Sequence, residues 1–234
     1  MDQRTNSAFL DYVDPSYFND QRTAIDIIAH NIDLPVDQTY ITNITRIRLI
    51  SCRLSEPPPG ITKYAMLSIL DLCENNLKSL PKNFFNHFPR LSQLDLSSNQ
   101  FTKFDFALPH SLTNLTISYN NNFDIKTLWN QNLPELVSLK ANFCSIEYLP
   151  SDEQEEDNPF SLPLPVFRNK LTSIQLDGNL FKKIPKVLTK FECLEEVSLF
   201  GNLIESIDNI HFQSQLKTLN ISYNNFNDTT KLQF

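Results

Sequence analysis

Residues 67–81 read LSILDLCENNLKSLP. They follow the pattern Leu-x-x-Leu-x-Leu-x-x-Asn-x-Leu, with Leu67, Leu70, Leu72, Asn75 and Leu77 at the fixed positions. The pattern starts at eight places in the chain: Ile44, Leu67, Leu91, Leu112, Leu136, Leu171, Leu194 and Leu216. Successive starts are 23, 24, 21, 24, 35, 23 and 22 residues apart. A period of this length indicates a repeat architecture.

Each copy predicts one short strand with a single buried face. Leu70 and Leu72, like Leu94 and Leu96, are two positions apart and therefore point to the same side of an extended segment. One copy has nothing beneath it against which to bury this side. Stacking the copies in parallel closes a continuous core, so we expect the strands to lie side by side in chain order.

A recurring Asn follows each strand in six of the copies. These residues are Asn75, Asn99, Asn120, Asn179, Asn202 and Asn224. An amide side chain can hydrogen-bond the backbone groups that a turn would leave unpaired. Cys52 and Cys144 take this position in the first and fifth copies, which predicts two buried thiols and no reactive ones. Cys73 falls on the exposed side of a strand and Cys193 just before a repeat, so no disulfide framework is visible.

The repeats resemble the leucine-rich repeat family over about residues 44–228. The resemblance implies an α/β solenoid of about eight repeats, with a curved parallel β-sheet on its concave side. Helical, 3-10 or irregular segments would then form the convex side. Leu-x-x-Leu-Pro, as in Leu77 to Pro81 and Phe181 to Pro185, resembles the typical intracellular class. Relatives of that class are Ras-binding scaffolds and repeat domains associated with adenylyl cyclases, phosphatases and kinases.

Two domains are expected. Residues 1–43 would form an N-terminal cap, with an amphipathic helix from Pro15 to His30 that buries Phe18, Ile25 and Ile28. An extended stretch from Leu34 to Thr45 would lead into the solenoid of residues 44–234. The long 35-residue step implies an acidic insertion near residues 151–162, read as a mobile loop or as a docking element for a basic partner. The short stretch after the last copy suggests a fragment of a longer protein.

Composition and motifs point away from catalysis. The three glycines form no phosphate-binding loop, and the four histidines have no partner at metal-ligand spacing, so we expect no enzyme activity, cofactor or metal. The net charge of −7 argues against a nucleic-acid partner. No apolar run reaches the roughly 18 residues of a membrane span, so none is expected.

A cytoplasmic location is the main expectation. The N-terminus resembles no secretory signal, and the clustered cysteine caps usual in extracellular members of the family are missing. Four glycosylation sequons, at Asn43, Asn114, Asn220 and Asn227, are interpreted as chance matches in an Asn-rich chain. A secreted or cell-surface recognition or adhesion protein is the alternative.

The concave face is the predicted binding surface, because the side chains between the buried strand leucines point there. Its candidate protein-binding residues are Arg46, Arg48, Asp71, Glu74, Asp95, Tyr119, Lys140, Phe143, Phe200 and Tyr223. The four aromatic residues are the expected anchors, since large aromatics dominate interface energetics. The competing interpretation is that these rings only pack along the edge between strand and loop.

The sequence therefore predicts a non-catalytic protein-interaction module, acting as an intracellular signalling scaffold or regulatory domain. A small GTPase or a phosphatase is the partner that the family resemblance suggests. A regulatory fragment of a larger phosphatase or kinase is a further alternative.

Overall fold

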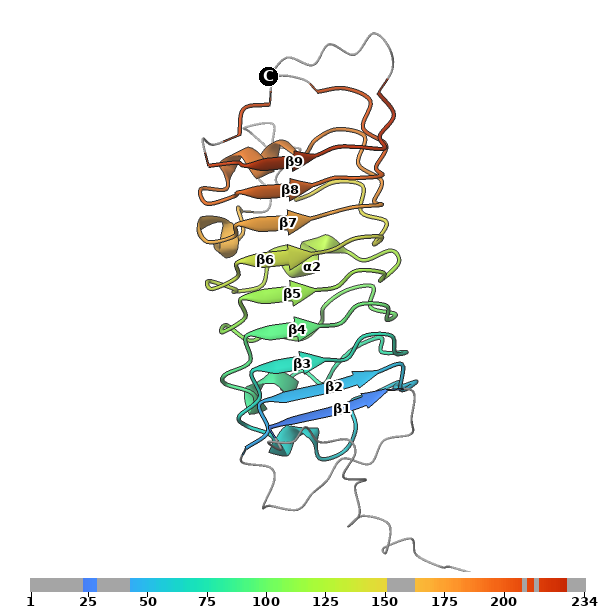
Figure 1. Cartoon of the computed structure of the whole chain (residues 1–234), viewed down its shortest axis with the longest axis vertical. Helices are drawn as coiled ribbons and strands as arrows, with labels where there is room; N and C mark the ends of the chain where they lie inside the picture. Colours follow the sequence, from blue (N-terminus) through green and yellow to red (C-terminus); the bar gives the residue numbers. More distant parts are fainter. Residues whose placement is uncertain (1–22, 29–42, 151–162, 208–209, 213–214, 227–234) are drawn as a thin grey trace, which may run out of the picture.

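The computed structural model describes residues 23–28, 43–150, 163–207, 210–212 and 215–226. Within them nine strands form one parallel sheet whose spatial order is the chain order, as Figure 1 shows. The strands are β1 (Ala24–Ile28), β2 (Arg46–Ile50), β3 (Ile69–Asp71), β4 (Gln93–Asp95), β5 (Asn114–Thr116), β6 (Ser138–Lys140), β7 (Ser173–Gln175), β8 (Glu196–Ser198) and β9 (Thr218–Asn220). The predicted solenoid is confirmed.

The predicted register is confirmed as well. The central apolar residue of each strand pairs with that of the next, as in Leu70 with Leu94 and Leu94 with Leu115. Leu70, Leu94 and Leu115 are at most 2% exposed. The repeat spacing therefore places the central apolar residue of each strand directly beside that of the strand before it. The core is continuous for this reason.

The predicted helix from Pro15 to His30 is wrong over Ala24–Ile28, which is strand β1. Ile25 and Ile27 are buried, two positions apart, and pair with Ile47 and Leu49 of β2. Ile28, assigned to the buried face of the helix, is 54% exposed. The short run favours a strand because β-branched residues at alternating positions suit a half-buried extended segment. The sheet thus begins 20 residues before the predicted boundary, and nine strands replace about eight.

Other expectations for the ends and the insertion fall outside the described residues. They concern the N-terminal half of that helix, most of the extended stretch from Leu34, the acidic insertion near residues 151–162, and the residues after 226. The last described strand, β9, is less well covered than the others: Leu219 is half-buried, whereas Val197, its partner in β8, is 1% exposed.

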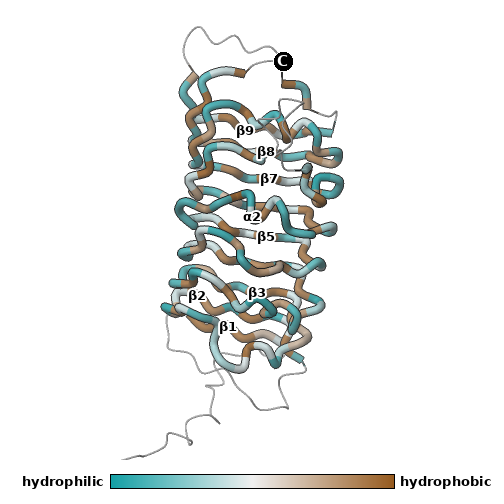
Figure 2. The backbone as a smooth tube through the Cα atoms, turned by 180° about the vertical axis from the view of Figure 1, so that it is seen from behind, coloured by the Kyte–Doolittle hydropathy of each residue, from teal (hydrophilic) through white to brown (hydrophobic). Residues whose placement is uncertain are grey.

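Short helical and irregular segments cover the other side of the sheet, where Figure 2 shows α2 lying across it. They are α2 (Ile125–Trp129) and the 3-10 helices η2 (Ile61–Lys63), η3 (Phe84–His87), η4 (Val166–Asn169) and η5 (Lys186–Lys190). Aromatic side chains fill this layer: Trp129 packs edge-on against Phe167, with ring centroids 5.6 Å apart. Helices are few because each repeat returns to the sheet within about twenty residues. None of them, in the part of the chain described, has the length and apolarity that crossing a bilayer requires.

The Asn row is confirmed as the element that closes each turn. Asn75, 6% exposed, accepts hydrogen bonds from the backbone N–H of Cys52 and of Leu54 through Oδ1, both at 3.0 Å. Its Nδ2 donates to the carbonyls of Leu49 and Leu72 at 2.7 and 3.0 Å. One side chain therefore hydrogen-bonds buried backbone groups of two successive repeats. Without it, the turn would leave these groups without partners.

Cys52 and Cys144 occupy the same row, as predicted, and both are buried. The Cys144 Sγ lies 3.3 Å from the carbonyl of Ile117, in the place that an Asn amide fills elsewhere. Burial raises the pKa of this thiol to about 11, against a smaller lowering by backbone hydrogen bonds. Because the thiolate is the reactive form, Cys144 serves the structure rather than chemistry.

The first prediction compares two neighbouring asparagines. Asn75→Ala should lower the free energy of unfolding by about 2–3 kcal/mol, because it strands buried backbone groups. Asn76 is exposed and its Oδ1 accepts a 3.3 Å hydrogen bond from Gln100, so Asn76→Ala should cost less than about 0.5 kcal/mol. Urea denaturation of the two variants measures both. Equal losses would contradict the bridging role of Asn75.

Candidate protein-binding surface

Strands β2–β9 expose a continuous surface of side chains, two from each strand, here named the strand face. It consists of Arg46, Arg48, Ile69, Asp71, Gln93, Asp95, Asn114, Thr116, Ser138, Lys140, Ser173, Gln175, Glu196, Ser198, Thr218 and Asn220. Each of these residues is half-buried or exposed, while the central residues of the same strands, β9 apart, are buried. Four of the predicted binding residues from β2–β4, and Lys140 from β6, lie on it.

Ion pairs organise its N-terminal end. The Arg46 guanidinium lies 3.1 Å from the Asp26 carboxylate of β1, and Arg48 lies 3.4 Å from Asp71. Both arginines predicted to bind a partner therefore already form ion pairs within the protein. Asp26 was not among the predicted residues, because its segment was assigned to a helix. Since the side chains of both arginines are about 40% exposed, these pairs stabilise the fold weakly and remain accessible to a partner.

A shallow depression of about 270 Å³ follows, with Arg48, Asp71, Asp95 and Lys140 around it. Burial raises the pKa of Asp95, and the nearby Asp71 carboxylate raises it further. Hydrogen bonds from Ser97 and the charge of Lys140 act in the opposite direction. Burial also raises the pKa of the Cys73 thiol, helped by Asp71. Asp71 and Asp95 therefore lie side by side on neighbouring strands, and burial partly desolvates the Asp95 carboxylate.

Glu74, Tyr119, Phe143 and Tyr223 lie in a different row from the strand face. They belong to the turn row, the residues immediately before the Asn or Cys that closes each turn: Ser51, Glu74, Ser98, Tyr119, Phe143, Gly178, Gly201 and Tyr223. Every one has a positive φ, between 50° and 65°. This conformation is costly for residues other than glycine. The direction in which a turn-row side chain leaves the backbone therefore depends on the turn, and not on the geometry of the strand.

The turn row stacks two of its aromatic rings. Tyr119 and Phe143 lie parallel, with centroids 4.8 Å apart and planes 9° from each other. They stay 54% and 42% exposed, so they form a flat apolar surface in contact with water. Gly178 comes next in the row, and a Cβ there would lie 2.2 Å from Phe143 Cε1. The absence of a side chain at Gly178 therefore leaves the space that the Phe143 ring occupies.

The other two predicted anchors form a second pair near β8 and β9. Phe200 and Tyr223 have centroids 4.8 Å apart at an angle of 52°. Tyr223 is 82% exposed, whereas Phe200 is 36% exposed. Phe200 precedes Gly201 and is held through its backbone N–H, which donates to Asp177 Oδ1 at 2.9 Å. The four aromatics thus make two separate pairs instead of one stripe.

Nothing in the described ranges forms a metal centre, since no group of three or more His, Cys, Asp or Glu is arranged to hold an ion. The strand face is open, and its hydroxyl and amide side chains lie at the surface. It can hydrogen-bond a protein surface, and it lacks the enclosed walls that a small-molecule site needs.

The repeat pattern is also recognised by a family model. Residues 65–123 match the model described as "Leucine rich repeat". The fold is a leucine-rich repeat solenoid. The sequence of the chain is 26% identical to keratocan of Coturnix japonica over 168 residues, which is 70% of this chain and 44% of keratocan.

Two further relatives are much longer than this chain. The chain is 28% identical to leucine-rich repeat serine/threonine-protein kinase 1 of Mus musculus, over 80% of this chain and 9% of the kinase. It is 29% identical to Ras guanine nucleotide exchange factor V of Dictyostelium discoideum, over 78% of this chain and 9% of that protein. The leucine-rich repeat chain thus spans less than half the length of each of these relatives.

Solved structures share the fold. A leucine-rich repeat protein of Leptospira interrogans superposes with a TM-score of 0.64 at 22% identity, covering 87% of this chain and 50% of that one. The glycosylated Toll–Spätzle complex of Drosophila gives 0.63 at 19% identity, covering 85% of this chain and 27% of that one. At these identities the likeness establishes the solenoid and nothing about partners.

Asp95 gives a pH-dependent prediction. Its pKa is raised in the folded state, so its charge opposes folding, and stability is lost as the pH rises from the ordinary carboxyl value through the raised one. Asp95→Asn keeps an oxygen to accept the 2.8 Å hydrogen bond from Ser97 N, and should increase the free energy of unfolding near neutral pH. The gain should shrink as the pH falls through the Asp95 pKa. Urea titrations across the acidic range measure it, and a gain independent of pH would contradict this account.

The two turn-row glycines provide a matched pair. Gly178→Ala and Gly201→Ala should each lose about 1 kcal/mol of stability to backbone strain alone, because both positions have φ above 60°. Only the Ala at 178 meets a ring, since a Cβ at Gly201 has no neighbour closer than 3.9 Å. We therefore expect Gly178→Ala, and not Gly201→Ala, to displace Phe143 from Tyr119. Ring chemical shifts of Tyr119 in NMR spectra report the displacement, and unchanged shifts would refute it.

Proposed function

We propose that this leucine-rich repeat protein is a non-catalytic module that binds another protein through the strand face and the adjoining turn row. The observation that carries the proposal is the parallel stack of Tyr119 on Phe143, both more than 40% exposed. Large aromatic side chains left in water at the edge of a polar surface are typical anchors of protein interfaces.

Binding through this surface is energetically favoured because its groups are already ordered. Strand-face side chains rise from a sheet with a continuous buried core. In the turn row the turns hold the backbone of Tyr119 and Phe143, and the two rings stack on each other. Little conformational freedom is left to lose on binding, so more of the contact energy appears as affinity. The eight strands β2–β9, about 4.8 Å apart, give a face roughly 35 Å long, which suits a protein partner.

Within this function we favour an intracellular signalling scaffold or regulatory domain. The similarity to a serine/threonine-protein kinase and to a Ras guanine nucleotide exchange factor supports it, as do four free cysteines, two of them buried in the Asn row. Since the chain matches only 9% of either relative, a regulatory segment of a larger kinase or phosphatase fits the same observations. A small GTPase or a phosphatase remains the partner proposed from family resemblance.

The second candidate is a secreted or cell-surface recognition protein. The similarity to keratocan supports it, together with the exposed sequon residues Asn43 and Asn114. The two candidates differ in a measurable way, because N-glycosylation requires the secretory route. Mass spectrometry of the natural protein purified from its source cells should find Asn43 and Asn114 unmodified. Glycans on either residue would favour the second candidate and exclude a cytoplasmic location.

The binding prediction uses two double variants. Tyr119→Ala with Phe143→Ala should weaken capture of the partner from a source-cell lysate by about 2 kcal/mol, or roughly thirtyfold in Kd once the partner is purified. The control is Val137→Ala with Val166→Ala, which removes exposed apolar surface outside the strand face and the turn row. Val137 is 37% and Val166 49% exposed, and this variant should change Kd less than about twofold. Partner binding that survives loss of the rings would place recognition elsewhere.

A further inference from the structure

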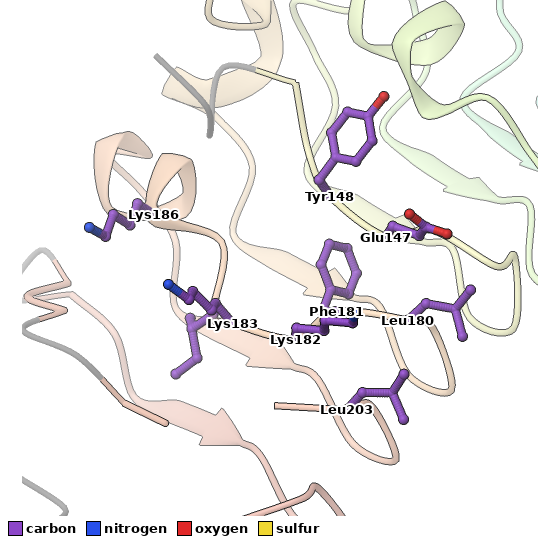
Figure 3. A pocket seen from close by; sticks show the side chains of 9 residues that line it. Glu147, Tyr148, Leu180, Phe181, Lys182, Lys183, Lys186 and Leu203 are labelled. Carbon is purple, nitrogen blue, oxygen red and sulfur yellow. The ribbon is translucent and has the colours of Figure 1, made fainter. Parts of the chain in front are cut away.

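A second hollow lies after the turn row, on the segments that leave β6, β7 and β8. It has a volume of about 610 Å³ and is shown in Figure 3. The residues around it are Glu147, Tyr148, Leu180, Phe181, Lys182, Lys183, Ile184, Lys186 and Leu203. They follow the Asn-row positions Cys144, Asn179 and Asn202 by one to seven residues, so none of them belongs to the strand face.

The walls of this hollow are apolar. Phe181 and Ile184 are buried, and Leu203 is half-buried. Tyr148 and Leu180 are 39% and 38% exposed, which places them among the few large apolar side chains that the described residues leave in water. An apolar hollow of this volume lies in the range of sites that accept a ligand side chain.

The rim is positively charged. Lys182, Lys183 and Lys186 are all exposed, and none makes an ion pair with another described residue. The ammonium of Lys126 lies 5.3 Å from the centroid of the Tyr148 ring, so a fourth cation borders the apolar wall. Glu147 supplies the one negative charge among the lining residues. This basic rim stands out in a chain whose net charge is −7.

We propose that this hollow is a docking site for a carboxylate-rich peptide segment of a partner protein, with one large apolar side chain placed against Tyr148, Leu180 and Leu203. Charge complementarity selects the occupant: the three lysines that line the hollow attract carboxylates, and the apolar wall favours a segment that also carries a large apolar side chain. Lysines act as separate point charges and suit several carboxylates along a segment better than the paired oxygens that arginine recognises. Nucleic acid is disfavoured by the overall negative charge.

This docking site is independent of the strand face. The aromatic stack belongs to the turn row at the end of the strands, while the lysines lie on the segment that runs from Phe181 to η5. A partner could occupy either surface without the other. The test below can therefore fail while the proposed function stands, and the reverse also holds.

The test uses a fluorescein-labelled peptide, Glu-Asp-Glu-Phe-Glu-Asp, with anisotropy as the readout. The unmodified protein should bind it, and raising the salt from about 50 mM to about 500 mM should weaken the binding. Lys182→Glu with Lys183→Glu and Lys186→Glu should raise Kd about tenfold or more. Leu180→Ser, or a peptide with Ser in place of Phe, should raise it several-fold, because apolar burial is lost.

Matched controls make the result specific. Lys78→Glu with Lys103→Glu reverses exposed lysines in the corresponding segments of earlier repeats, outside the hollow, and should leave Kd within about twofold. The Tyr119→Ala, Phe143→Ala variant should also bind the peptide normally. Circular dichroism and thermal melts confirm that each variant folds.

Three results would overturn the proposal. The first is no binding of the peptide at about millimolar concentration, the weak limit of specific recognition. The second is an equal loss in the Lys78, Lys103 control. The third is binding that appears only after deletion of residues 152–157, whose sequence carries five acidic residues, because the occupant would then be a segment of this chain.

Discussion

The hydrogen bonds of the Asn row are the interactions on which the rest of the structure depends. Strands of three residues cannot satisfy the backbone groups of the turns that follow them. The Asn179 amide pairs with Cys144 N and Ile146 N through Oδ1 and with the carbonyls of Ala141 and Leu176 through Nδ2. Each such side chain connects one turn to the turn of the preceding repeat, so the row propagates along the solenoid like a second, buried ladder beside the sheet.

The same constraint creates the candidate binding edge. To aim the Asn inward, the residue before it adopts a positive φ in all eight turns of the row. That residue therefore projects at the edge of the strand face, once per repeat and at the repeat spacing. Glycine accepts the conformation without strain, as at Gly178 and Gly201. Where Tyr119 and Phe143 take the position in neighbouring repeats, the shared backbone geometry brings their rings into parallel contact. The proposed recognition would thus use a position that folding already requires.

The features that recur in every repeat could be predicted from the sequence. The features that depend on differences between repeats could not. Eight strands and their register followed from the leucine and Asn spacing. Strand β1 was missed because its copy is degenerate: at the 22-residue offset, Arg22 replaces Ile44 and His30 replaces Cys52, leaving only Ile25 and Ile27 to carry the pattern. Missing β1 also hid Asp26, and with it the ion pair that engages Arg46.

The candidate site divides in the same way. The ten predicted binding residues were found by their position relative to the strands, and all ten lie on the strand face, in the turn row or, for Phe200, next to it. Their pairing was not predictable, because whether two rings stack depends on φ at Tyr119 and Phe143 and on the space above Gly178. The basic hollow had no signal in the repeat pattern, since Tyr148, Leu180 and Lys183 occupy variable positions of two neighbouring repeats.

This division has a physical cause that bears on how such a protein acquires binding sites. In a solenoid each repeat contacts only its neighbours, so a change at a variable position stays local and leaves the leucine and Asn rows intact. The invariable rows then provide stability, while any two or three adjacent repeats can combine their variable residues into a site. The aromatic stack draws on two repeats and the basic hollow on three. Because the two lie at different points of the repeat, along the turn row and beyond it, one chain can present two chemically distinct surfaces without either compromising the core.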